Sequence, residues 1–355
     1  MRCPKCHRFL PEGFKFCPYD GSTTVDRMDP SMLRAEPTKI RDKMLGDRFR
    51  IRGFVGKGAM ARVYLAEDER SGMPVAVKVL EEPHRSDPKI RERFEREARM
   101  ASMIGHPSIV TIYEAGQRED DGAPYLVMEF LVGETVGDFL RREGKMPRAM
   151  AVPALQQAAS ALAAAHRAGI IHRDVKPDNL FLLGEPGDPY ELKIVDFGLS
   201  KEQSSNMTAT GVVMGTPATM APEQILGEGV DGRTDVYALG VVAYWMLAGR
   251  QPFDDTDDEI ATLAHHVWTA PAPLGAIANE VDQRLESIVM RAMRKAPDDR
   301  YASMDEFAEA LERVDNPGQT SPDPLPLDKA YQTKTLVGQL VKASLGRAID
   351  REEEA

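Results

Sequence analysis

Short alternating runs of apolar and polar residues occupy the first part of the sequence after residue 47. The alternation over residues 49–52 and 63–66 predicts strands, and the more continuously apolar runs at 75–80 and 125–130 predict strands with buried faces. Between them, residues 90–104 are charged but place apolar positions on one face at helical spacing. The pattern therefore predicts a strand-rich unit that contains one helix.

Helical patterns dominate the later part of the chain. Residues 151–167 are rich in alanine and consist almost entirely of helix formers. Residues 236–247 are apolar on every side, which predicts a helix buried in the core of a large unit. Amphipathic helices are expected at 282–295 and 303–313, and the prolines of 315–328 break regular structure. A predominantly helical unit should therefore follow the strands.

Composition and charge exclude several classes of protein. The chain has 355 residues, is 42% hydrophobic, and carries 56 acidic against 45 basic residues for a net charge of −11. It can bury a core, and it is a poor general binder of nucleic acid or anionic membranes. The longest uncharged stretch of interest, 236–249, is shorter than the roughly 20 residues that span a bilayer. With no apolar signal-peptide core at the start, we expect a cytoplasmic protein.

A glycine-containing loop between two predicted strands is the first candidate for phosphate binding. Residues 56–63 fit the pattern G-x-G-x-x-G-x-V with Ala61 in place of the third glycine. Glycines let the backbone approach phosphates closely and point its N–H groups at them. An ordinary hairpin turn would give the same short pattern. A dinucleotide-binding site is less favoured, because a strand rather than a helix follows the loop.

One lysine interrupts the apolar run Val75-Ala76-Val77-Lys78. A buried ammonium group is costly unless it is paired. Glu97, in the helical segment 90–104, is the expected partner. The alternative is that Lys78 reaches solvent from an edge strand and that Glu97 is simply solvated.

The motif His172-Arg173-Asp174-Val175-Lys176-Pro177-Asp178-Asn179 follows the alanine-rich helix, and Asp196-Phe197-Gly198 comes 17 residues after Asn179. Taken with the loop and the lysine, in this order and at this spacing, the set resembles the eukaryotic-like (bacterial-type) serine/threonine protein kinases. The resemblance covers roughly residues 48–314. It implies an α+β bilobal protein-kinase-like fold, with a strand-rich N-lobe holding one regulatory helix and a helical C-lobe.

The resemblance also implies a role for each motif residue. Asp174 would accept the hydroxyl proton, Lys176 would meet the γ-phosphate, and Lys78, held by Glu97, would bind the α- and β-phosphates of ATP. Asn179 and Asp196 supply hard oxygen ligands for Mg²⁺ or Mn²⁺. The remaining nucleotide contacts would come from Val55, Gly56, Lys57, Gly58, Ala59, Met60, Ala61, Arg62, Val63, Ala76, Met128 as gatekeeper, Glu129, Leu131 and Phe181.

Further parts of the family pattern lie downstream. Gly215-Thr216-Pro217 precedes Ala221-Pro222-Glu223, as in a substrate-positioning loop, and Thr216 should contact Asp174 and Lys176. Asp235 should cap the apolar helix and hold the catalytic loop. Arg300 is the expected buried partner of Glu223, although both could instead be surface charges.

A phosphate-controlled switch is expected in the activation segment. Arg173 directly precedes Asp174, and a phosphate on Thr208 or Thr210 could pair with it and order the loop. Ordinary loop threonines are the alternative. Two departures from the family pattern, Ala61 and Thr219, leave the motif residues untouched; Thr219 stands where bacterial relatives often have tyrosine, which could alter peptide docking.

The three cysteines, Cys3, Cys6 and Cys17, all lie within the first 17 residues. The spacing resembles a short zinc ribbon with Asp20 at the fourth position, and His7 is the competing ligand. A module of 24 residues has almost no apolar core, so the metal would have to supply its folding energy. A metal-free reduced tail and a redox-active thiol cluster are the alternatives.

The expected organisation has four parts: a zinc-ribbon-like module at 1–24, a linker at 25–47, a kinase domain at 48–314 whose lobes meet near residue 130, and a proline-rich linker and tail at 315–355. The expected partners are ATP and protein substrates, and a further protein could bind the module or the tail. A non-catalytic scaffold with a kinase fold and a small-molecule kinase are the rival functions.

Overall fold

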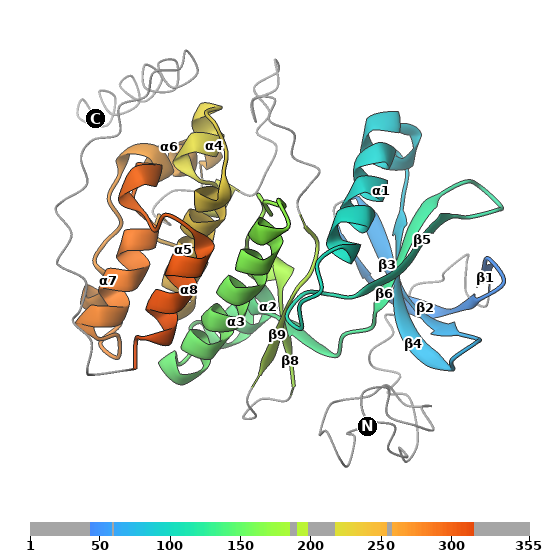
Figure 1. Cartoon of the computed structure of the whole chain (residues 1–355), viewed down its shortest axis with the longest axis horizontal. Helices are drawn as coiled ribbons and strands as arrows, with labels where there is room; N and C mark the ends of the chain where they lie inside the picture. The colour runs from blue at the N-terminus through green and yellow to red at the C-terminus, as the bar shows by residue number, and fades with distance from the viewer. Residues whose placement is uncertain (1–42, 59, 185–189, 198–216, 254–257, 316–355) are drawn as a thin grey trace. The chain divides into compact units, whose positions relative to one another are not determined.

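The computed structural model describes residues 43–58, 60–184, 190–197, 217–253 and 258–315, apart from the side chains of Glu97 and Ala98. The chain divides into two compact units (Figure 1). The first unit comprises the chain up to Glu134 together with the later segment Phe181–Val195. The second unit comprises Thr135–Leu180 and the chain from Asp196 onward. A strand-rich unit and a helical unit confirm the fold class expected of the described residues.

The first unit is built on an antiparallel sheet of six strands in the order β1-β2-β3-β4-β6-β5. All four runs expected to form strands lie in it, apart from Phe130, which follows the end of β6. The strands are β1 (Met44–Leu45), β2 (Phe49–Lys57), β3 (Ala61–Asp68), β4 (Met73–Leu80), β5 (Ile112–Gln117) and β6 (Pro124–Glu129). The predicted helix is α1 (Pro88–Ser102), and its N-cap Asp87 accepts a hydrogen bond from the backbone of Lys89 at 2.8 Å.

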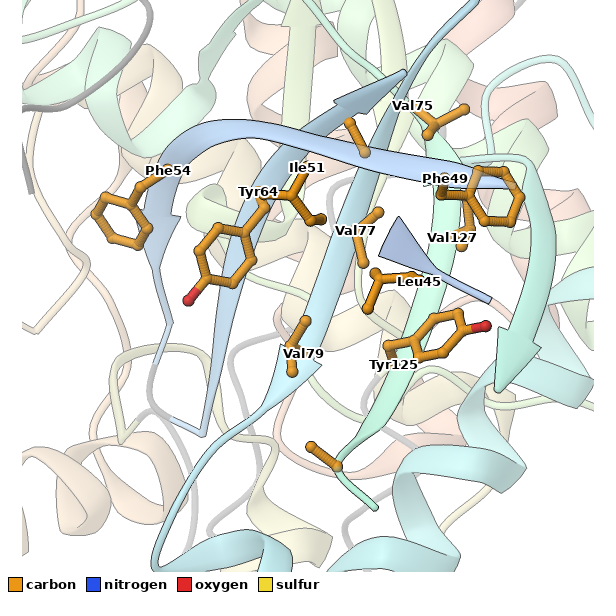
Figure 2. Close-up of a cluster of buried hydrophobic side chains, with 12 residues drawn as sticks. Leu45, Phe49, Ile51, Phe54, Tyr64, Val75, Val77, Val79, Tyr125 and Val127 are labelled. Atoms are coloured by element: carbon orange, nitrogen blue, oxygen red, sulfur yellow. The ribbon is translucent and has the colours of Figure 1, made fainter. Parts of the chain in front are cut away.

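The two faces of this sheet carry different residues, because successive side chains along a strand point to opposite faces. Val75, Val77 and Val79 of β4 pack on one face with Phe49, Ile51 and other residues into a closed core (Figure 2). Ala76 and Lys78 lie on the opposite face. The core cluster consists of Leu45, Phe49, Ile51, Phe54, Tyr64, Ala66, Val75, Val77, Val79, Ala123, Tyr125 and Val127.

A second, three-stranded sheet has the order β7 (Gly133–Thr135), β8 (Leu180–Leu183) and β9 (Glu191–Ile194). Gly133 has φ +149°, and a Cβ atom there would lie 1.9 Å from the carbonyl oxygen of Leu182. Only glycine therefore permits this close approach of β7 to β8.

The second unit is organised around α5 (Gly232–Ala248), which packs against α3, α7 and α8. Thirteen of its residues are buried, as the all-round apolar pattern predicted. The helix begins earlier than expected, with Asp231 as the N-cap that accepts from the backbone of Arg233 at 2.8 Å. The expectation that Asp235 caps it was therefore wrong. The other helices are α2 (Val136–Glu143), α3 (Arg148–Arg167), α4 (Pro222–Leu226), α6 (Glu259–Trp268), α7 (Gln283–Ala292) and α8 (Met304–Glu312).

Within the described ranges, no helix has both the length and the apolar character needed to cross a membrane. The expected linker and tail beyond residue 315 lie outside these ranges.

A buried carboxylate at the end of β3 gives a first prediction. Asp68 accepts two hydrogen bonds of 2.9 Å from Arg48, one from Nε and one from Nη2, which lower the pKa of its carboxyl to about 2. Since the folded pKa lies below the unfolded value of about 3.9, the ionised group contributes stability above that value and loses it as the pH falls towards 2. We expect Asp68→Asn to lower the free energy of unfolding by about 1.5–3 kcal/mol at pH 7.

Urea unfolding at pH 7, 5 and 3 would measure this effect. The gap between wild type and Asp68→Asn should narrow at the lowest pH. Asp47→Asn, at an 86% exposed side chain that meets Arg70 at the surface, is the control and should change the free energy of unfolding by less than about 1 kcal/mol. A gap that stays constant with pH would contradict the assignment.

Candidate active site

The segment 172–179 of the second unit brings three predicted polar groups together. Lys176 Nζ donates to Asp174 Oδ2 at 2.9 Å, and Asn179 Nδ2 donates to the carbonyl oxygen of Asp174 at 2.8 Å. The Asp174 and Lys176 side chains are 14% and 24% exposed, and Asn179 is buried. The loop thus holds one carboxylate in a defined position beside one ammonium group.

Asp235 of α5 holds the segment 172–179 through hydrogen bonds to its backbone. Its carboxylate is fully buried and accepts from the backbone N–H groups of His172 and Arg173, both at 2.8 Å. The same carboxylate meets His166 Nε2 at 2.7 Å. Arg173 has φ +63°, a left-handed conformation that costs a residue other than glycine about 1–3 kcal/mol. The hydrogen bonds that Asp235 accepts offset this cost, so the expectation that Asp235 holds this loop is confirmed.

The start of the next motif lies in the same unit. The ring of Phe197 is buried and packs on the ring of His172, with 4.8 Å between centroids. Asp196 directly precedes it and adopts φ +56°. Since Asn179 uses its amide nitrogen on Asp174, its amide oxygen is the atom left to act as a ligand. A carboxylate and an amide oxygen are the hard donors that Mg²⁺ takes, so Asp196 and Asn179 fit such an ion.

In the first unit, the loop 56–63 joins β2 to β3 as a hairpin in which Gly56 pairs with Val63. The Gly58 N–H donates to the carbonyl oxygen of Ala61 at 2.8 Å. Ala61, which replaces the third glycine, is only 5% exposed and packs with Leu80, Phe94 and Leu126. Its methyl group therefore lies in the core beside α1, which explains how the loop accommodates an alanine.

The residues expected around the adenine share one cluster in the first unit. Leu65, Ala76 and Phe130 form its buried centre, with Val55, Val63, Met128 and Val132 packed against it. Lys78 lies on the same face of β4 as Ala76, opposite Val63 on β3 and Leu126 on β6. The sheet thus places the predicted phosphate-binding lysine beside the predicted adenine cover. Phe181 lies elsewhere in this unit, next to Gly133.

Glu129 takes part in a buried ion pair that the sequence did not reveal. Its carboxylate accepts from Lys193 Nζ on β9 at 2.6 Å and from the Thr111 N–H at 2.7 Å. The two charged side chains are 8% and 12% exposed. The Glu129 N–H itself donates to the carbonyl oxygen of Thr111 at 2.9 Å. A bound base could therefore use the carbonyl oxygen of Glu129 but not its N–H.

The second expected pair, Glu223 with Arg300, is confirmed. Arg300 Nη1 and Nη2 each donate to one carboxylate oxygen of Glu223 at 2.8 Å, and both side chains are buried. Thr234 Oγ1 adds a third hydrogen bond to Glu223 at 2.7 Å. The bidentate pair ties α4 to the turn before α8.

Several expected site residues lie outside the described residues. These are Ala59, Gly198, Thr208, Thr210, Thr216 and the proposed zinc ligands Cys3, Cys6, His7, Cys17 and Asp20. Glu97 lies in α1, but its side chain is not described, so its pairing with Lys78 stays a prediction. Across the part of the chain that the structure describes, no group of three or more His, Cys, Asp or Glu residues could hold a metal ion.

Comparison with known proteins agrees with this geometry. Residues 49–312 match the protein kinase domain family. The serine/threonine-protein kinase Pkn1 of Myxococcus xanthus is 41% identical over 283 residues, which cover 78% of this chain and 40% of that protein. The serine/threonine-protein kinase PknB of Mycobacterium tuberculosis is 37% identical over 297 residues, covering 82% of this chain and 46% of that protein.

Among solved structures, the kinase domain of Mycobacterium tuberculosis PknI is similar, with a TM-score of 0.60 at 29% identity over 77% of this chain and 98% of that one. The chain belongs to the protein kinase family. It spans less than half the length of the curated relatives Pkn1 and PknB.

The buried pair at Glu129 gives a second prediction. Lys193→Met would remove the charge partner and leave the Glu129 carboxylate buried, so we expect the free energy of unfolding to fall by about 3–5 kcal/mol. In the double variant Glu129→Gln/Lys193→Met neither charge remains, and most of that loss should be recovered.

A double-mutant cycle by urea unfolding would measure this coupling. Lys145→Met, at an exposed lysine that pairs with Glu280 on the surface, is the matched control and should cost less than about 1 kcal/mol. Equal losses in the single and double variants would show that the pair does not act as a unit.

Proposed function

We propose that the chain is an ATP- and Mg²⁺-dependent serine/threonine protein kinase, which transfers the γ-phosphate of ATP to hydroxyl groups of proteins. The observation that carries the proposal is the segment 172–179, in which one loop holds Asp174 beside Lys176 and Asn179. The names of the relatives, serine/threonine-protein kinases, support it. The lysine two positions after Asp174 resembles the serine/threonine class of the family.

The transfer would proceed as an in-line displacement at phosphorus. The substrate hydroxyl oxygen forms a bond to the γ-phosphorus while the bond to the β–γ bridging oxygen of ATP breaks, with ADP as the leaving group. Asp174 accepts the hydroxyl proton and orients the nucleophile. Lys176, held against Asp174 Oδ2, places a positive charge where the γ-phosphate gains negative charge. Bound Mg²⁺ would neutralise further phosphate charge, with Asn179 and Asp196 as its protein ligands.

Lys78 and the apolar cluster around Ala76 would hold the nucleotide in the first unit. Lys78 would pair with the α- and β-phosphates, while Val55, Val63 and Met128 cover the adenine. In the second unit, residues 215–223 would dock the protein substrate. The Glu223–Arg300 pair supports this assignment, since it anchors one end of the segment in the core.

The proposed role of Asp174 predicts a large loss of activity on substitution. Asp174→Asn keeps the shape of the side chain but removes the base, so we expect kcat to fall by about 10²- to 10⁴-fold. Transfer of labelled γ-phosphate from Mg-ATP to the chain itself and to a lysine-rich histone would measure it.

Asp298→Asn is the matched control, because the Asp298 side chain is 92% exposed and pairs only at the surface with Arg233. It should leave kcat unchanged. If the wild-type chain binds ATP but transfers no phosphate, the result would favour the alternative function, a non-catalytic scaffold with a kinase fold. Transfer to a small molecule but to no protein would favour a small-molecule kinase.

We further propose that autophosphorylation on Thr208 and Thr210 activates the enzyme, with Arg173 as the partner of the phosphate. The Arg173 backbone is fixed next to Asp174, which supports a coupling between that arginine and the site. We expect the double variant Thr208→Ala/Thr210→Ala to have lower kcat than the wild type. Phosphopeptide mapping of the wild type is the direct test; finding both threonines unmodified in fully active enzyme would refute the switch.

We also propose that residues 1–24 bind one zinc ion through Cys3, Cys6, Cys17 and Asp20. Three cysteines at ribbon spacing in a segment with almost no apolar core support this reading. Elemental analysis of the purified chain should find about one zinc per molecule, and Cys6→Ser should lose it. Comparing Asp20→Asn with His7→Ala would identify the fourth ligand. A metal-free wild type would contradict the proposal.

A further inference from the structure

Gln224, the residue after the Ala221-Pro222-Glu223 triplet, uses both ends of its side-chain amide inside the protein. Its Oε1 accepts a hydrogen bond from the Ala221 N–H at 3.1 Å, and its Nε2 donates to the carbonyl oxygen of Arg173 at 3.1 Å. Gln224 is only 6% exposed. One buried side chain thus connects the segment before α4 with the segment that carries Asp174.

The carbonyl group that Gln224 holds lies at a strained point of the chain. Arg173 has φ +63°, and its N–H is held by Asp235 Oδ1 at 2.8 Å. Its carbonyl oxygen, held by Gln224, belongs to the peptide bond that leads directly into Asp174. The polar groups on both sides of the strained residue are therefore bonded, one to α5 and the other to α4. Together these bonds set the direction in which the chain enters Asp174.

The anchoring of α4 makes this contact effective. Glu223, next to Gln224, is fixed by the bidentate bond to Arg300 and by Thr234. The Ala221 N–H is itself buried, and Gln224 Oε1 supplies its acceptor. The oxygen of the Gln224 amide is consequently held at the N-cap of α4, which directs its nitrogen to one place.

We propose that Gln224 is a positioning residue for phosphoryl transfer: by holding the Arg173 carbonyl, it aligns Asp174 with the segment that docks the protein substrate. This inference rests on the proposed function, in which Asp174 is the base and residues 215–223 bind the substrate. It adds a physical link between those two parts. Because the bonds of Gln224 to Ala221 and Arg173 both lie in the second unit, at the segment that carries Asp174, it should act on the transfer step rather than on ATP binding.

Two substitutions separate the two hydrogen bonds. Gln224→Met has similar length and makes neither bond. Gln224→Glu keeps an oxygen for the Ala221 N–H but has no donor for Arg173. If the bond to Arg173 is the one that positions Asp174, both variants should lower kcat, by about 10- to 100-fold, as expected for a small displacement of a catalytic group.

The matched control is Gln156→Met. Gln156 Nε2 on α3 also donates to a backbone carbonyl oxygen, that of Leu311 on α8, at 3.0 Å. This substitution removes a bond of the same kind within the same unit, away from the segment 172–179. It should lower the melting temperature by an amount similar to that for Gln224→Met, with kcat close to that of the wild type.

The experiment measures kcat, KM for ATP and KM for a lysine-rich histone in the four chains, with thermal melts of each. We expect both Gln224 variants to lose kcat, with KM for ATP within about twofold of the wild type, and both to be folded at the assay temperature. Should Gln224→Met melt below that temperature, the same expectation applies to Gln224→Glu alone.

Three results would overturn the inference: unchanged kcat in Gln224→Glu, an equal loss of kcat in Gln156→Met, or an effect confined to KM for the histone. Asp174→Asn, assayed in parallel, shows whether only the positioning role of Gln224 is wrong or whether the proposed kinase activity is wrong as well. If Asp174→Asn is inactive while the Gln224 variants behave as wild type, only the role of Gln224 falls. If the wild type transfers no phosphate, both fall together.

Discussion

The helical unit depends on one buried carboxylate, that of Asp235. It accepts from two successive backbone N–H groups, those of His172 and Arg173, and also contacts His166. A fully buried anion is tolerated only where such partners surround it, so the loop and the carboxylate stabilise each other. The left-handed backbone at Arg173 persists because these bonds hold it. The position of Asp174, the proposed base, follows from this arrangement, and Gln224 adds a hydrogen bond to the carbonyl oxygen on the other side of Arg173.

In the strand-rich unit, the main constraint is the placement of one charged side chain, that of Lys78, on the otherwise apolar strand β4. In β4, Val75, Val77 and Val79 enter the closed core (Figure 2). Ala76 and Lys78 face the other way, because side chains alternate along a strand. The valines thus close one core, while Ala76 and Lys78 lie on the face proposed to bind the nucleotide. Ala61, the alanine of the glycine-containing loop, also contributes to the core, because its methyl group packs with Leu80 and Phe94 and does not fill the loop.

Much of the fold could be predicted because strands and helices have local periodic signatures. The strands at 49–52, 63–66 and 75–80 and the buried helix at 236–247 lie within observed elements, and the run at 125–130 extends one residue beyond β6. The start of that helix was placed wrongly, because Asp231 and Asp235 are both residue types that suit a helix start, and only the backbone shows which one caps it. The Glu223–Arg300 pair was foreseen from the family resemblance and not from any local pattern.

The sequence by itself determined the class of fold, the motif residues and the family. Each of these can be recognised from short motifs or periodic patterns of residues that lie at a characteristic spacing along the chain. Only the tertiary structure decided which buried polar groups outside the family motifs meet. Lys193 and Glu129 are 64 residues apart, and Gln224 and Arg173 are 51 apart, with nothing in either local pattern to mark them as partners. Such pairs form because folding removes these groups from water, and each must then find its hydrogen bonds wherever the packed chain brings a partner.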